Sequence, residues 1–164
     1  MSVSGVSRAT KASPFPAIAK ASLPADHLFQ MKANGQVLNG SDGLITTLVS
    51  GAQGSDPYCG WKYTAGSHAE WKLNSVAKCD GTFYFEGDAN VSGNPGPWKT
   101  TLIATGDIVI SGTPTIQTDN THKTNCGTNC YTVRDTVFVA GYDVKINGDA
   151  TVGYGMIAPM NRSA

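Results

Sequence analysis

Three aspartates follow glycine residues at related positions in the second half of the chain. Asp88 and Asp107 come directly after a glycine, and Asp143 follows Gly141 by two residues. If these segments stack as neighbouring strands, their carboxylates lie about 5 Å apart, a spacing that suits paired-carboxylate glycoside hydrolysis. Asp is also favoured beside a turn glycine, where its side chain accepts hydrogen bonds from the backbone. We therefore expect a structural column of aspartates, and no catalytic residue is predicted.

Metal and cofactor chemistry has little support in the sequence. The aspartate column could hold calcium, but the glycine-rich calcium repeat is absent and each copy offers only one carboxylate. His27, His68 and His122 fall in irregular segments, away from any nucleophile motif, and no HExxH or phosphate-loop motif is present. The sequence therefore predicts neither a metal ion nor a cofactor.

The cysteines are Cys59, Cys79, Cys126 and Cys130. An even number of cysteines in a small, glycine-rich chain indicates disulfides and an oxidising compartment. We expect the pairs Cys59–Cys79 and Cys126–Cys130, because each pair is close in sequence and brackets a polar segment. A zinc site stays open as an alternative, since His122 precedes Cys126 by four residues. A redox-active CGTNC motif is a weaker alternative.

Aromatic residues gather around the expected Cys59–Cys79 loop. Such clusters can bind sugars, but we prefer the interpretation that they pack around the disulfide. The residues concerned are Trp61, Trp71, Tyr58 and Tyr63.

A repeated pattern supplies the elements that would position these residues. TFYFEGDANVSG (82–93), TLIATGDIVISG (101–112) and TVFVAGYDVKING (136–148) share a threonine, three apolar residues, a glycine, an aspartate and an alternating apolar segment. In this alignment Tyr142 is an extra residue of the third copy, and a fourth copy begins at Gly155. The alternation predicts that every second residue of the later segment faces a core.

The spacing of the copies indicates the architecture. Thr82 and Thr101 are 19 residues apart, whereas Thr101 and Thr136 are 35 apart, which is one period plus an insertion in the region 114–135. A period near 20 with short strands and glycine corners is typical of a solenoid. We therefore predict an all-β fold, a parallel β-solenoid (β-helix) with ~19-residue coils, one inserted disulfide loop and an irregular N-terminal part.

We expect a single domain over residues 1–164. Within it, 1–50 would form an irregular N-terminal segment or cap, and 51–81 would form the disulfide-loop region. Residues 82–161 would hold the solenoid repeats, with the insertion at about 114–135.

One apolar residue in each copy is expected to point away from the core. The flanking residues of each apolar triplet would face inward, so the middle residues would form an outer stripe that needs a cover. We expect a partner-facing stripe covered by residues 14–50 or by a neighbouring subunit. Its members are Tyr84, Ile103, Phe138 and Ile157.

Composition argues against several classes of partner. Lys plus Arg and Asp plus Glu number 12 each, so the formal net charge is zero and no basic surface for nucleic acid or anionic membranes is predicted. No apolar stretch is long enough to span a bilayer. The opening MSVSGVSRATKASPFPAIAK has no apolar signal-peptide core, so an exported protein would carry its targeting segment elsewhere.

The repeats FYFEGDANVSGN and LIATGDIVISGT, with the closing GMIAPMN, resemble the β-solenoid ectodomain of large pilin-like and type IV pilus-assembly proteins of bacteria. The likeness covers mainly residues 82–161. It implies an extracellular, non-enzymatic structural or adhesive component of a surface filament (fimbrium). The implied partners are other filament subunits, and a helix-bearing pilin among them, in a homo- or hetero-oligomer. This chain lacks the apolar N-terminal helix typical of the family, so it would be an ectodomain or a separate subunit.

Two other functions remain open from the sequence. A carbohydrate-active β-helix enzyme or a polysaccharide-binding module would use the aspartate column or the aromatic cluster. A polymerising cytoskeletal solenoid of the bactofilin kind is disfavoured, because the cytosol would reduce the expected disulfides.

Overall fold

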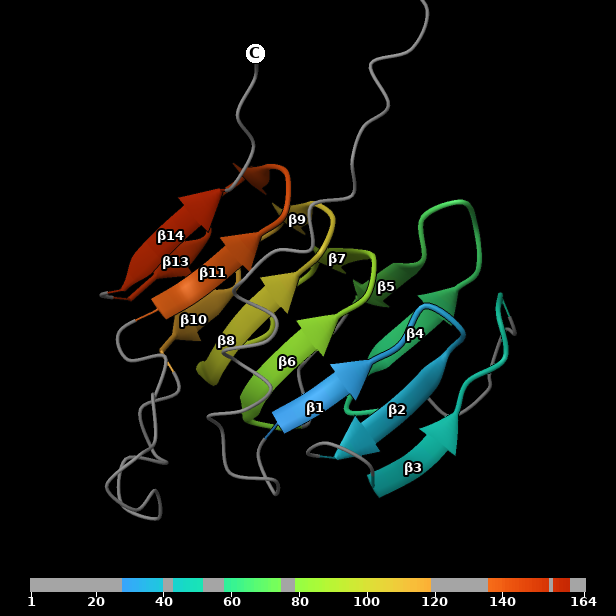
Figure 1. Cartoon of the computed structure of the whole chain (residues 1–164). Coiled ribbons are helices and arrows are strands. Elements are labelled where there is room, and N and C mark those ends of the chain that lie inside the picture. The colour runs from blue at the N-terminus through green and yellow to red at the C-terminus, as the bar shows by residue number, and fades with distance from the viewer. Residues whose placement is uncertain are drawn as a thin grey trace, which may run out of the picture.

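The protein is an all-β molecule built from two mixed sheets, neither of which closes on itself (Figure 1). The computed structural model describes residues 28–39, 43–51, 58–74, 79–118, 136–153 and 155–159. The described part of the chain contains strands and turns and no helix, so none is long and apolar enough to cross a membrane. The all-β prediction is confirmed.

The larger sheet has nine strands, and its central members lie side by side across the front of the molecule (Figure 1). Strand β8 is long enough to pair with β6 and β11 at its end and with β10 at its start. The strands are β1 (Leu28–Met31), β2 (Gln36–Asn39), β3 (Gly43–Thr47), β6 (Gly81–Phe85), β8 (Trp98–Ala104), β10 (Thr115–Gln117), β11 (Thr136–Ala140), β13 (Thr151–Val152) and β14 (Met156–Pro159).

The smaller sheet has five strands in the order β12-β9-β7-β5-β4. After β6, and again after β8 and β11, the chain crosses to this sheet for one short strand and then returns to the larger one. The strands are β4 (Trp61–Thr64), β5 (Glu70–Leu73), β7 (Asp88–Val91), β9 (Ile108–Ile110) and β12 (Val144–Ile146).

The copies of the sequence pattern pair with one another as parallel strands. Strand β6 pairs with β8 so that Thr82 lies opposite Thr101, which is the predicted interval of 19 residues. In the smaller sheet β7, β9 and β12 pair in the same order. Each copy therefore places its strands directly beside those of the next copy.

The first strand of the third copy is shifted by one residue from the predicted alignment, whereas its second strand pairs as predicted. Phe138 pairs with Leu102 and Val144 with Ile108, an interval of 36 residues in both sheets. Because the interval is the same on both sides of the corner, Tyr142 is not an extra residue: Gly141 lies opposite Thr105, and Tyr142 lies opposite Gly106. The predicted alignment matches Gly141 with Gly106 by sequence similarity, whereas the strand pairing matches Phe138 with Leu102.

Two of the predicted boundaries are wrong. Part of the segment 1–50 expected to be irregular forms regular strands, since β2 pairs antiparallel with both β1 and β3. Strand β1 also pairs parallel with β6 and so extends the repeated array. The insertion cannot begin at residue 114, because β10 pairs with the start of β8 and with β13; residues 119–135 lie outside the described part.

The core lies between the two sheets and is rich in aromatic side chains. Trp61 packs its ring 4.6 Å from that of Phe85 and 6.0 Å from that of Trp98. Trp61 and Trp71 are fully buried, and Tyr63 packs against Trp71. This cluster is therefore core, as the packing interpretation predicts, and its indole faces are closed to a sugar.

At two corners between the larger and the smaller sheet, the neighbouring copy leaves no room for a side chain. A Cβ atom on Gly141 would lie 2.0 Å from the carbonyl oxygen of Thr105, and one on Gly106 would lie 1.9 Å from Oδ1 of Asp88. The hydrogen bond from Gly141 N–H to Ala104 C=O, 2.9 Å, fixes this close approach. Glycine is therefore required here by the neighbouring copy.

Candidate functional site

The aspartate column is a set of hydrogen-bond acceptors that joins successive copies. Oδ1 of Asp88 accepts the backbone N–H of Asp107 at 2.8 Å, and Oδ1 of Asp107 accepts that of Asp143 at 3.1 Å. Lys145 lies 3.0 Å from Oδ2 of Asp107 and 3.7 Å from Oδ2 of Asp143. Asp88 and Asp107 thus hold the backbone of the next copy, a structural role.

The electrostatics of Asp107 agree with that role. Partial burial alone would raise the pKa of its carboxyl, but the hydrogen bonds from Lys145 and from the Asp143 N–H outweigh it and lower the pKa. A depressed pKa keeps the acceptor ionised, whereas a general acid for glycoside hydrolysis needs a raised pKa. Within the described ranges no three His, Cys, Asp or Glu side chains are grouped as a metal site.

The predicted Cys59–Cys79 disulfide is present and fastens β4 to the segment that leads into β6. Beside it, the indole N–H of Trp98 donates to the Cys79 carbonyl at 2.8 Å. Cys126 and Cys130 lie outside the described residues, as do His27 and His122. His68 is exposed in the turn between β4 and β5.

The predicted partner-facing stripe is only partly correct. Tyr84 and Ile103 share a column and are buried, but Phe138 belongs to the main core and Ile157 pairs with Phe138. The shift of one residue in the third copy explains the error, because it reverses the face of every side chain in the strand. Val139 takes the place expected for Phe138.

A second apolar cluster, separate from the main core, therefore replaces the stripe. It consists of Leu28, Tyr84, Ile103 and Val139 on β1, β6, β8 and β11. The described part of the segment 14–50 does not lie over this cluster. Instead, β1 joins the sheet beside β6 and contributes Leu28 to the cluster. Residues 14–27 lie outside the described part.

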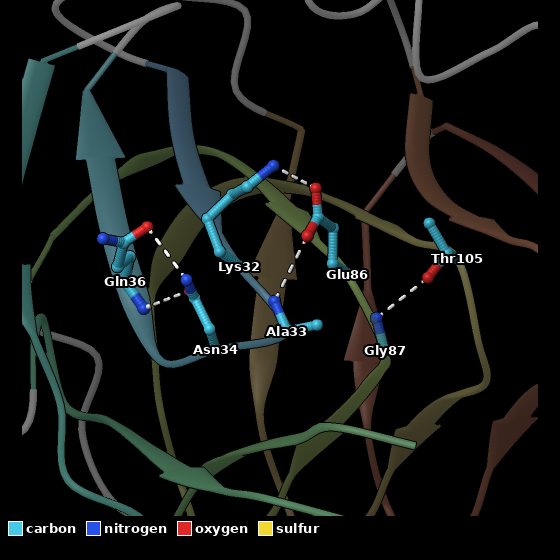
Figure 2. Close-up of polar contacts among 7 residues, drawn as sticks. All are labelled: Lys32, Ala33, Asn34, Gln36, Glu86, Gly87 and Thr105. Carbon is cyan, nitrogen blue, oxygen red and sulfur yellow. Dashed lines mark hydrogen bonds and ion pairs between the residues drawn. The ribbon is translucent and has the colours of Figure 1, made fainter. Parts of the chain in front are cut away.

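At one end of the repeated array the turn between β1 and β2 is held by a polar network, drawn in Figure 2. Glu86 forms an ion pair with Lys32 and accepts the N–H of Ala33 at 3.2 Å. Burial, and to a smaller extent the Glu86 carboxylate, raise the pKa of the nearby Tyr84 to about 12. Further along the same corner, Thr105 Oγ1 accepts the Gly87 N–H at 2.8 Å.

The core at this end is closed by antiparallel hairpins. The Tyr63 hydroxyl donates to the Ala33 carbonyl at 2.6 Å, and the Leu48 N–H donates to the Gly35 carbonyl at 2.9 Å. Tyr63 and Trp61 on the edge strand β4 are buried. We call this the hairpin end; its outermost described strands are β3 and β4.

The opposite end is formed by β12, β13 and β14, and within the described ranges no antiparallel hairpin closes it. We call it the open end. Ile157 continues the inward column of Phe83, Leu102 and Phe138, whose side chains are fully buried, yet it is 41% exposed. Ile146 continues a second buried column and is also 41% exposed. The last copy therefore presents core-type side chains where a further copy would cover them.

The hairpin end has exposed apolar residues of another kind. Leu44 and Ile45 on the edge strand β3 are 56% and 42% exposed, and Val49 just beyond it is 68% exposed. All the large, exposed apolar side chains in the described ranges lie at these two ends. The sequence pattern did not single out Leu44, Ile45 or Val49, because β3 does not belong to the repeat.

The two ends are therefore the candidate functional site. Among the described residues, each end presents an edge strand with a partner on one side only, together with exposed apolar side chains. This combination favours the addition of a further strand. A search of protein-family models, of curated proteins and of solved structures found no match to this chain.

Proposed function

We propose that the chain is a non-enzymatic structural or adhesive component of a bacterial surface filament, with a β-solenoid as its core. The observation that carries this proposal is the parallel register of successive copies in two sheets together with the open end. In a stack of repeats each copy contacts only its neighbours, so further copies can extend the stack at an uncovered end, as a filament requires.

The extracellular location rests on the disulfide and on the likeness of FYFEGDANVSGN and LIATGDIVISGT to pilin-like ectodomains. Disulfides persist in oxidising compartments, and Cys59–Cys79 closes a loop of 20 residues at the border of the aromatic core. Other filament subunits, including a helix-bearing pilin, are the proposed partners.

The competing carbohydrate-active enzyme has no support from the aspartates. Asp88 and Asp107 accept backbone N–H groups of the next copy, and the aromatic rings that could bind sugar are in the core. Substitution of Asp88 by Asn keeps an acceptor oxygen, so it should preserve the fold, whereas a catalytic carboxylate would be abolished. Loss of a polysaccharide-cleaving activity in D88N would establish the enzyme instead.

Immunogold electron microscopy of the source cells tests the proposal directly. Antibodies raised against the folded chain should label surface filaments, and isolated filaments should contain the chain by mass spectrometry. Cells lacking the gene are the control. Labelling confined to the cytosol, with Cys59 and Cys79 alkylated as free thiols in cell extracts, would contradict the proposal.

A further inference from the structure

We infer that the open end of one molecule binds the hairpin end of a second copy, so that β14 pairs with β3 of the next molecule. This inference rests on the proposed filament function and names the partner and the surfaces that it uses. The product is a head-to-tail chain of identical subunits.

The exposed side chains at the open end identify what would cover them. Ile157 and Ile146 occupy positions whose equivalents in the preceding copies are fully buried by the next pair of strands. Burying these exposed apolar side chains against a further layer of strands would therefore be favourable. The matching surface is therefore another layer of strands.

The column of aspartates that joins successive copies ends with Asp143 at the open end. Asp88 and Asp107 each accept the backbone N–H of the residue one copy further on. Asp143 is the last aspartate of this column in the described residues. Its side chain is 49% exposed and forms an ion pair with Lys145. An incoming backbone N–H would continue the column.

Strand direction selects the hairpin end of a second copy. Strand β1 runs parallel to β6, and two antiparallel pairings lead from β1 through β2 to β3. Strand β3 therefore runs in the same direction as β14, and both are outer strands of the nine-stranded sheet, as is β13. Joining β14 to β3 of a second copy continues the nine-stranded sheet with the two joined strands parallel. Leu44 then lies at the joint on the face that Leu38 and Tyr84 share, and Ile157 lies at the joint on the core face.

A complementation experiment tests this geometry. Leu44→Lys places a charge on the hairpin end and Ile157→Lys places one on the open end; both positions are already exposed, so both variants should fold. Analytical ultracentrifugation of the wild-type chain should show oligomers that lengthen with concentration. Each variant alone should self-associate about tenfold or more weakly, because burying an unpaired charge at the joint is costly.

The mixture of the two variants gives the decisive result. Ile157→Lys retains an intact hairpin end and Leu44→Lys retains an intact open end, so an equimolar mixture should form one-to-one dimers and nothing longer. Thr113→Lys, on an exposed turn away from both ends, is the matched control and should associate like the wild type. Thermal unfolding of each variant verifies the fold, and Ile146→Lys serves as a second open-end variant.

Other outcomes overturn the inference. If Leu44→Lys dimerises as strongly as the wild type while Ile157→Lys does not, the open ends bind each other about a two-fold axis. If the wild-type chain stays monomeric at every concentration, the open end binds a different protein. Either result is compatible with gold labelling of surface filaments, so it would overturn only the head-to-tail contact. Oligomers without such labelling would instead refute the proposed function and leave the head-to-tail contact supported.

Discussion

At the scale of single residues, glycine and aspartate together hold neighbouring copies in contact. Gly106 and Gly141 let the backbone of one copy approach the next, and Asp88 and Asp107 then accept the backbone N–H groups brought within reach. The Gly-Asp pair that first suggested chemistry is thus explained by packing at a corner. Lys145 adds a cation that joins Asp107 and Asp143.

Gly141→Ala should destabilise the protein strongly. The new Cβ would meet the Thr105 carbonyl oxygen at 2.0 Å, and because its nearest neighbours are all backbone atoms of Thr105, no side-chain movement can relieve the clash. We expect a loss of about 3 kcal/mol in the free energy of unfolding, measured by chemical denaturation. Gly153→Ala is the matched control, because its nearest neighbour would lie at 3.4 Å; equal stability of the two variants would show that the corner is not tight.

Tyr84 should make the stability fall at alkaline pH. Its pKa is raised from 10.0 to about 12 by burial and by Glu86, so the neutral phenol is favoured in the folded state. The resulting stabilisation is fully present below pH 10 and is lost as the pH rises toward 12. Tyr84→Phe should therefore lose less stability than the wild type over this range in denaturation experiments.

The contribution of the hydroxyl itself must be separated from its ionisation. Both proteins are compared first at about pH 8, where tyrosine is neutral in either state. Tyr58, whose pKa is also raised by burial, is present in both proteins and cancels in the comparison. Parallel loss of stability above pH 10 would show that Tyr84 is accessible to hydroxide and that its cluster is open to solvent.

At the scale of elements, the repeated strands were predictable and the terminal hairpins were not. The segments 82–93 and 101–112 carry the same pattern at an interval that the strand pairing preserves. The third copy was misaligned by one residue because matching Gly141 to Gly106 gave better letter-by-letter agreement than the strand register does. The stripe built on that alignment therefore placed Phe138 on the wrong face.

Strands β1 to β5 carry no comparable signal. Each has four or five residues, and β2, β3 and β4 pair antiparallel with partners that do not share the repeat. Their positions depend on contacts distant in sequence, such as Phe29 against Phe83 and Lys32 against Glu86, which no local pattern contains. For the same reason the exposed residues of β3 were not recognised as part of a site.

Removing the Cys59–Cys79 disulfide should weaken the hairpin end. The bond closes a loop of 20 residues, so replacing both cysteines by alanine should cost about 3 kcal/mol in the free energy of unfolding. Reductant should destabilise the wild type by about this amount more than it destabilises the double variant, which retains only Cys126 and Cys130. An equal loss on reducing the double variant would assign the stabilisation to a different bond.

At the scale of the whole molecule, the two ends differ in how well they are protected. Strands β6 to β9 have neighbours on both sides, whereas β12 and β14 have a described neighbour on one side only. Hydrogen exchange on a dilute sample should therefore show the slowest amides in β6 to β9 and faster ones in β12 and β14. Uniform protection would show that the open end is covered in the isolated protein.

The interval between the second and third copies has a consequence for how such a molecule can vary. From β8 to β11 and from β9 to β12 the interval is 36 residues instead of 19, yet the pairing continues in register across both sheets. The register of the described strands therefore does not require a constant number of residues between successive copies.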